Sequence, residues 1–264
     1  MSGSFTASLS NAAQAVEGLS TIAGLPSTGI DIRNTMVAAI TPVIDEAPKL
    51  QKSILDFSGN SIPELEQIIR DLDNGADPTS EKTKLLTLAQ QFSALKSQSG
   101  SLHQMVINAT NTISGQSTAI AQTEQQLRSQ IANLDGEIAA AKAQRDAAQK
   151  KYYWLLALGP FGLIGLSVAL GLYLKWKGDV DALGQQINAL SAQIIPFQAM
   201  LHASATLGTA SSGLINVIGQ LDSAVDAVSS DMGEIIANLS SPDDLKLFIT
   251  ATIGMIRTLE ADAA

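Results

Sequence analysis

The sequence predicts an all-α protein, an elongated antiparallel bundle of about five helices in which two very long helices are joined by an apolar hairpin head. Three observations predict this fold. Apolar residues recur at heptad spacing on both sides of one apolar run at residues 152–176. No proline interrupts residues 79–158. No alternating strand pattern, internal repeat or low-complexity linker divides the 264 residues.

The N-terminal part is expected to form three shorter helices. The first is a weakly amphipathic helix over residues 8–24. The second covers residues 30–57, where Pro42 and Pro48 predict a kink or a break. A capping box at residues 61–64, with proline near the helix start, then predicts a separate short helix that stops before an Asn-Gly turn.

The first long helix is expected to begin after Asp77-Pro78, with Asp77 as its cap. Single glycines at 100, 115 and 136 cost about 1 kcal/mol each in a helix without forcing a break. The apolar residues of its seam are separated by steps of three, four and seven. They are Ile120, Leu127, Ile131, Leu134 and Ile138.

The second long helix follows the apolar run with the same periodicity. Its seam begins with Val180, Leu183, Ile187, Leu190, Ile194, Phe197 and Leu201 and continues to Leu239. Pro196 predicts a kink in it. Residues 241–244, Ser-Pro-Asp-Asp, are expected to cap a last helix. Because two heptad segments of similar length flank one apolar run, antiparallel packing would place that run at the turn between them.

The apolar run has the layered pattern of a segment that meets a bilayer. All three tyrosines and both tryptophans lie within it, and lysines stand just outside. The residues expected to insert are Trp154, Leu155, Leu156, Leu158, Pro160, Phe161, Leu163, Ile164, Leu166, Val168, Leu170, Leu172 and Leu174. Those expected at the membrane interface are Lys150, Lys151, Tyr152, Tyr153, Tyr173, Lys175, Trp176 and Lys177.

Two membrane geometries are compatible with this run. As one straight helix, residues 155–172 would extend about 27 Å, close to the hydrocarbon thickness of a bilayer. The Gly-Pro-Phe-Gly sequence at 159–162 instead predicts a hairpin with two short arms. The flanking seams favour the hairpin, which divides the chain into a membrane-inserting head at 152–176 and a helical-bundle tail at 1–151 and 177–264. A core helix buried within a soluble protein is the third interpretation.

Composition excludes several classes of function. The net charge of −9 argues against nucleic acid as a partner. The chain has no cysteine, and its two histidines, His103 and His202, have no acidic residue within four positions. We therefore expect no enzyme, no metal and no cofactor. The N-terminus lacks a basic segment followed by an apolar one, so we also expect no Sec signal peptide.

The order lysine, aromatic, apolar, Gly-Pro-Phe-Gly, apolar, aromatic, lysine between two long helical segments resembles the cytolysin A superfamily of α-pore-forming toxins. That group includes haemolysin BL, the non-haemolytic enterotoxin and the xenorhabdolysin-type toxins. The small size and short head are most similar to the C-type component of tripartite toxins from Gram-negative bacteria. Residues 154–174 match the family's membrane-inserting head.

This resemblance implies a secreted toxin component that anchors in one leaflet of the target-cell membrane. It also implies other toxin components as partners, recruited to complete a lytic pore. The exposed head further predicts a homo-oligomer, or folding against the bundle, that hides it in water. The alternatives are a membrane-anchored coiled-coil scaffold and a soluble helical interaction module.

Overall fold

The computed structural model describes residues 4–157, 163–229, 232–239 and 241–263. Side chains are described for these residues except at 4, 152–157, 163–171, 227–228, 234 and 237. The described residues form six helices and no strand, which confirms the all-α fold. The helices are α1 (Ser4–Ser20), α2 (Ser27–Asp73), α3 (Pro78–Ala157), α4 (Leu163–Ser229), α5 (Met232–Asn238) and α6 (Pro242–Ala263).

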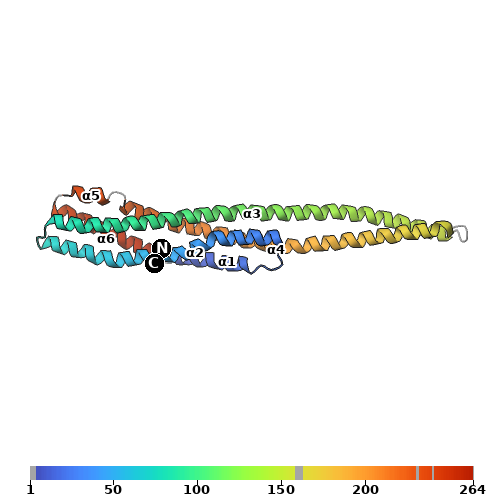
Figure 1. The fold of residues 1–264 in the computed structure, drawn as a ribbon, viewed down its shortest axis with the longest axis horizontal. Coiled ribbons are helices and arrows are strands. Elements are labelled where there is room, and N and C mark those ends of the chain that lie inside the picture. Colours follow the sequence, from blue (N-terminus) through green and yellow to red (C-terminus); the bar gives the residue numbers. More distant parts are fainter. Residues whose placement is uncertain (1–3, 158–162, 230–231, 240, 264) are drawn as a thin grey trace. The chain divides into compact units, whose positions relative to one another are not determined.

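The chain divides into two compact units, and α3 and α4 contribute to both. Unit 1 comprises residues 1–21, 33–117 and 203–264, and unit 2 comprises residues 22–32 and 118–202. Figure 1 shows the helices coloured along the sequence. Unit 2 contains the predicted head together with parts of both long helices, and the division into a membrane-inserting head and a helical-bundle tail stays a prediction.

Unit 1 holds the larger apolar core. Phe92 of α3 is fully buried, and its ring meets that of Phe57 of α2 edge to face, with centroids 4.4 Å apart. Helix α6 turns an apolar face into this core. Its buried residues are Leu245, Ile249, Thr252, Ile253, Ile256, Leu259 and Ala263.

Polar contacts at the surface of unit 1 join α6 to α2. Arg257 Nη2 lies 3.0 Å from Glu66 Oε1, and Lys246 Nζ lies 2.9 Å from Asp73 Oδ1. Such exposed pairs contribute little to stability, about 0–1 kcal/mol each. Their role is therefore to align α6 along α2, and the buried apolar face supplies most of the stability.

Helix α2 is continuous where the sequence predicted two helices. Pro42, Pro48 and Pro63 all lie inside it. Each interior proline costs about 3 kcal/mol, but burial of one large aliphatic side chain contributes about 1.5–3 kcal/mol. The buried apolar residues around these prolines are Met36, Ile40, Val43, Ala47, Leu50, Ile54, Leu65 and Ile68. Their combined burial outweighs the local cost, so the helix continues.

The predicted capping box at Ser61 is therefore wrong. Ser61 is 1% exposed, and its hydroxyl has no hydrogen-bond partner among the described residues. A hydroxyl in mid-helix faces a backbone whose amides already bond within the helix, so it has no free amide to cap.

The turn between α2 and α3 follows the prediction. Helix α2 ends at Asp73, and Gly75 of the Asn-Gly sequence that follows adopts φ +86°, a left-handed conformation that favours glycine. Asp77 then caps α3, because its Oδ1 accepts from the Thr79 amide at 3.0 Å.

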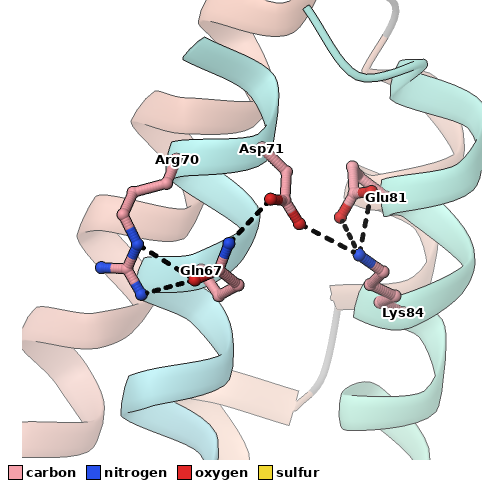
Figure 2. A network of polar contacts seen from close by, with 5 residues as sticks. All are labelled: Gln67, Arg70, Asp71, Glu81 and Lys84. Carbon is pink, nitrogen blue, oxygen red and sulfur yellow. Dashed lines mark hydrogen bonds and ion pairs between the residues drawn. The ribbon is translucent and has the colours of Figure 1, made fainter. Parts of the chain in front are cut away.

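A network of polar side chains ties the two sides of this turn together (Figure 2). Asp71 accepts from Gln67 Nε2 at 2.7 Å, and Lys84 Nζ lies 3.3 Å from the other carboxylate oxygen of Asp71. Lys84 also donates to Glu81, and Arg70 to Gln67. The hydrogen bond from Gln67, followed by the contact with Lys84, lowers the pKa of Asp71. Because the folded-state pKa is lowered, this link is complete at neutral pH and is lost as the pH falls through that pKa.

We expect Asp77→Ala to destabilise the chain by about 1 kcal/mol, because the first turn of α3 loses the side-chain acceptor of its cap. Urea unfolding followed by circular dichroism measures the change. Asp77→Asn retains the acceptor oxygen and should stay close to the unaltered chain. Equal destabilisation by both substitutions would contradict a capping role.

Cross-helix contacts show that α3 and α4 run antiparallel in each unit. In unit 1, Ser99 pairs with Asp222 and Ser117 with Ser204, at 2.7 and 3.0 Å. In unit 2, Gln198 Nε2 donates to Glu124 Oε1 at 3.0 Å, and later residues of α3 (137–144) line a groove with earlier residues of α4 (176–186). In each pair the two positions are equally distant in sequence, to within one residue, from residue 161. The packing register is therefore the same in both units.

Beyond residue 201 the second long helix differs from the prediction. It was expected to continue to Leu239, but α4 ends at Ser229 and α5 is a separate short helix. Ser229 Oγ donates to the Asp226 carbonyl at 3.3 Å, one of the local bonds by which serine competes with helix continuation. Pro196 lies inside α4 without ending it. The predicted last helix is confirmed as α6, capped where Asp244 N donates to Ser241 Oγ at 3.1 Å.

Candidate membrane-contacting site

The predicted head lies where α3 ends and α4 begins. Because these consecutive helices are antiparallel in unit 2, the chain reverses direction between Ala157 and Leu163. Helical backbone is described up to residue 157 and again from residue 163. Leu158, Pro160 and Phe161 lie outside the described residues. The predicted hairpin sequence, residues 159–162, lies between α3 and α4 and outside the described residues, so the hairpin stays a prediction.

Only part of the predicted insertion set has described side chains. Leu172 and Leu174 are 41% and 55% exposed, which is high for leucine. The side chains at Trp154, Leu155, Leu156, Leu163, Ile164, Leu166, Val168 and Leu170, and the interfacial Tyr152 and Tyr153, lie outside the described residues. Their insertion in a membrane stays a prediction.

We define the basic collar as Lys150 and Lys151 of α3 together with Lys175 and Lys177 of α4. All four are exposed. The Nζ of Lys175 lies 5.1 Å from the centroid of the Trp176 ring, within cation–π range. The interfacial set of the prediction thus combines water-accessible ammonium groups with an amphipathic ring.

Trp176 also lines a shallow groove between the two helices of unit 2. The groove has a volume of about 420 Å³ and is bordered by the small side chains of Ala140, Ala141 and Ala182. Tyr173 and Trp176 are each partly exposed. An aromatic side chain with one face on protein and one face in water suits the boundary between headgroups and water.

The described helices contain no stretch that is both long enough and apolar enough to cross a bilayer. In the same residues, no group of histidine, cysteine or acidic side chains could hold a metal ion.

A polar cluster in unit 1 brings together residues that the sequence did not connect. His103 Nδ1 lies 3.3 Å from Asp222 Oδ2, and Ser99 Oγ donates to Asp222 Oδ1 at 2.7 Å. Gly219 makes room for the imidazole, since a Cβ there would lie 3.2 Å from Nε2. The serine hydroxyl bonds the carboxylate and not the imidazole, so this arrangement provides no activated nucleophile.

Sequence reasoning missed Asp222 because it is 119 residues away from His103 along the chain. The register of α3 against α4 could have revealed this partner. Pairing about residue 161 places Gly219 opposite His103, and Asp222 lies within one helical turn of Gly219.

No protein-family model matches this chain. No curated protein sequence matches it either. Several solved structures match its fold. The structure matches the soluble AhlC triple head mutant of the tripartite α-pore-forming toxin AHL from Aeromonas hydrophila, with a TM-score of 0.85 and 23% identity over 99% of this chain and 98% of that chain. It matches soluble AhlC of the same toxin with a TM-score of 0.75 and 23% identity over 99% of each chain.

A match to a second component extends the similarity. The AhlB pore of the same toxin aligns with a TM-score of 0.63 and 15% identity, over 97% of this chain and 96% of that chain. The chain therefore has the fold of the AhlC and AhlB components of a tripartite α-pore-forming toxin.

Proposed function

We propose that this chain is a secreted component of a multi-protein α-pore-forming toxin. Its apolar head inserts into the target-cell membrane, and its helical bundle recruits partner components that complete a lytic pore. The observation that carries this proposal is the position of the apolar run. It spans the reversal between two antiparallel helices, in a fold that the chain shares over 99% of its length with a tripartite-toxin component.

The length of the head supports anchoring in one leaflet. Its arms of roughly 7 and 12 residues extend about 10–18 Å as helix, whereas the hydrocarbon core is about 30 Å thick. Such a hairpin reaches into a bilayer without crossing it. Partner components with longer apolar segments then supply the walls of the pore.

The head also implies a protected state in water. A contiguous apolar surface of this size promotes association between copies. We propose that copies of this chain pack their heads together before they meet a membrane, and that lipid then replaces those contacts in a two-state exchange. The activity consists of binding and assembly and needs no catalytic group or cofactor.

The test uses the purified full chain without detergent. We expect it to stay in the supernatant after ultracentrifugation and to float with lipid vesicles after mixing. Alone it should release no large encapsulated dye, because its arms are too short to form a pore wall. A chain that stays in solution only with detergent would instead support the second candidate, a resident membrane-anchored coiled-coil scaffold. A soluble chain that never floats would exclude both.

A further inference from the structure

Charge is distributed unevenly along this chain. Residues 142–177 contain six basic residues and one acidic residue, a net charge of +5. The remaining residues contain ten basic and 24 acidic residues, a net charge of −14, which together give the chain's −9. The segment that carries the head is therefore basic, whereas the rest of the chain is acidic in sum.

Ion pairing follows the same division. Of the ten basic residues elsewhere, at least seven pair with a carboxylate within 4 Å. They are Lys49, Lys52, Lys84, Lys96, Arg128, Lys246 and Arg257. In residues 142–177, Arg145 pairs with its neighbour Asp146 at 2.8 Å. The four lysines of the basic collar form no ion pair in the part of the chain that the structure describes.

The register of the two helices places the collar lysines close together along their axis. Because α3 and α4 pair about residue 161, Lys175 and Lys177 lie opposite residues 147 and 145, and Lys150 lies opposite residue 172. The four positions therefore fall within roughly 10 Å along the helix axis. Side chains of lysine extend toward headgroups while their stems stay on apolar surface.

We propose that the basic collar is a binding surface for the headgroups of anionic lipids, so that this chain prefers membranes rich in phosphatidylglycerol or phosphatidylserine. This inference rests on the proposed function, since it names the lipid class that the anchoring component selects. Ammonium groups without a carboxylate partner in the described residues lose no ion pair when they bind a lipid phosphate. The lysines elsewhere would have to break one.

The acidic residues around the basic collar determine how unit 2 is oriented on an anionic membrane. In unit 2, residues outside 142–177 carry one basic and six acidic side chains, among them Asp135, Glu137, Asp179 and Asp181. An anionic surface attracts the collar and repels these groups. Asp135 and Glu137 lie more than about 10 Å from Lys150 along α3, which is the range of charge interactions at 0.1 M salt, so an orientation with the head end toward the lipid keeps them away from an anionic surface.

The test compares the full chain with two double variants that remove the same charge. K175Q/K177Q removes half of the collar, and K49Q/K52Q removes two exposed lysines of α2 in unit 1. Sedimentation measures binding to vesicles of phosphatidylcholine alone and of phosphatidylcholine with 30 mol% phosphatidylglycerol. Each lysine near an anionic surface strengthens binding about fivefold. We therefore expect K175Q/K177Q to bind the anionic vesicles roughly 25-fold more weakly. Both variants should bind the neutral vesicles as the unaltered chain does.

Salt and a charge-preserving variant give independent readouts. Raising NaCl from 50 to about 500 mM should remove the preference for anionic vesicles. K175R/K177R should retain it. Equal binding of the unaltered chain to both vesicle types would overturn the anionic preference while leaving the proposed function in place. Equal weakening by K49Q/K52Q would overturn the assignment to the collar. Absence of binding to either vesicle type would overturn the proposed function itself.

Discussion

A chain carrying Leu163→Asp together with Leu166→Asp is expected to lose at least about a thousandfold in vesicle binding. One aspartate at the centre of a bilayer costs about 2.5–3.5 kcal/mol, so two cost about 5–7 kcal/mol. Each 1.4 kcal/mol is a factor of ten in binding, so a cost of about 4.2 kcal/mol, below the lower end of that range, already gives the expected loss. Flotation with vesicles, at rising lipid concentration, measures it.

The matched control places the same substitution outside the head. Ile195 and Leu247 are 70% and 73% exposed, so Ile195→Asp with Leu247→Asp adds two carboxylates at positions already in water. This variant should float like the unaltered chain. Circular dichroism establishes that both variants stay helical. If the head variant floats unchanged, the head is not what binds lipid.

Phe92→Ala is expected to destabilise the chain by about 3–5 kcal/mol. The Phe92 ring is fully buried against Phe57, and its removal leaves a cavity in the core of unit 1 as well as losing the burial of the ring. Because most domains are stable by only about 5–15 kcal/mol, this is a large fraction of the total. Urea unfolding at constant pH measures the change.

Leu86→Ala is the control for this experiment. Leu86 lies on the same helix but is 42% exposed, so its truncation should cost less than about 1 kcal/mol. A loss below about 1 kcal/mol for Phe92→Ala would mean that the core of unit 1 does not hold α3 in the described position.

The helix boundaries that depend on local chemistry could be predicted. The cap at Asp77, the left-handed Gly75 and the cap at Ser241 each act within a few residues, so their signals lie in short stretches of sequence. The same local rules misplaced the boundaries inside α2, because they gave weight to the cost of Pro42 and Pro48 and to a capping box at Ser61. These rules do not include the burial of apolar side chains, which offsets the cost of the prolines and keeps α2 continuous.

The contacts between helices could be predicted only in outline. The apolar run and its two flanking seams predicted antiparallel packing, and the contacts of Glu124 with Gln198 and of Ser117 with Ser204 confirm it. The partner of His103 could not be predicted from neighbouring residues, since Asp222 reaches it only through the register of α3 and α4.

The sequence by itself determined that the chain is helical, where its apolar run lies and which lysines and aromatics border that run. These properties follow from residue type and period, because a heptad or a charge-free run is complete within its own segment. Tertiary structure decided the continuity of α2 and which lysines keep no acidic partner. Those depend on side chains far apart in the sequence, since burial and pairing arise only when separate helices pack against one another.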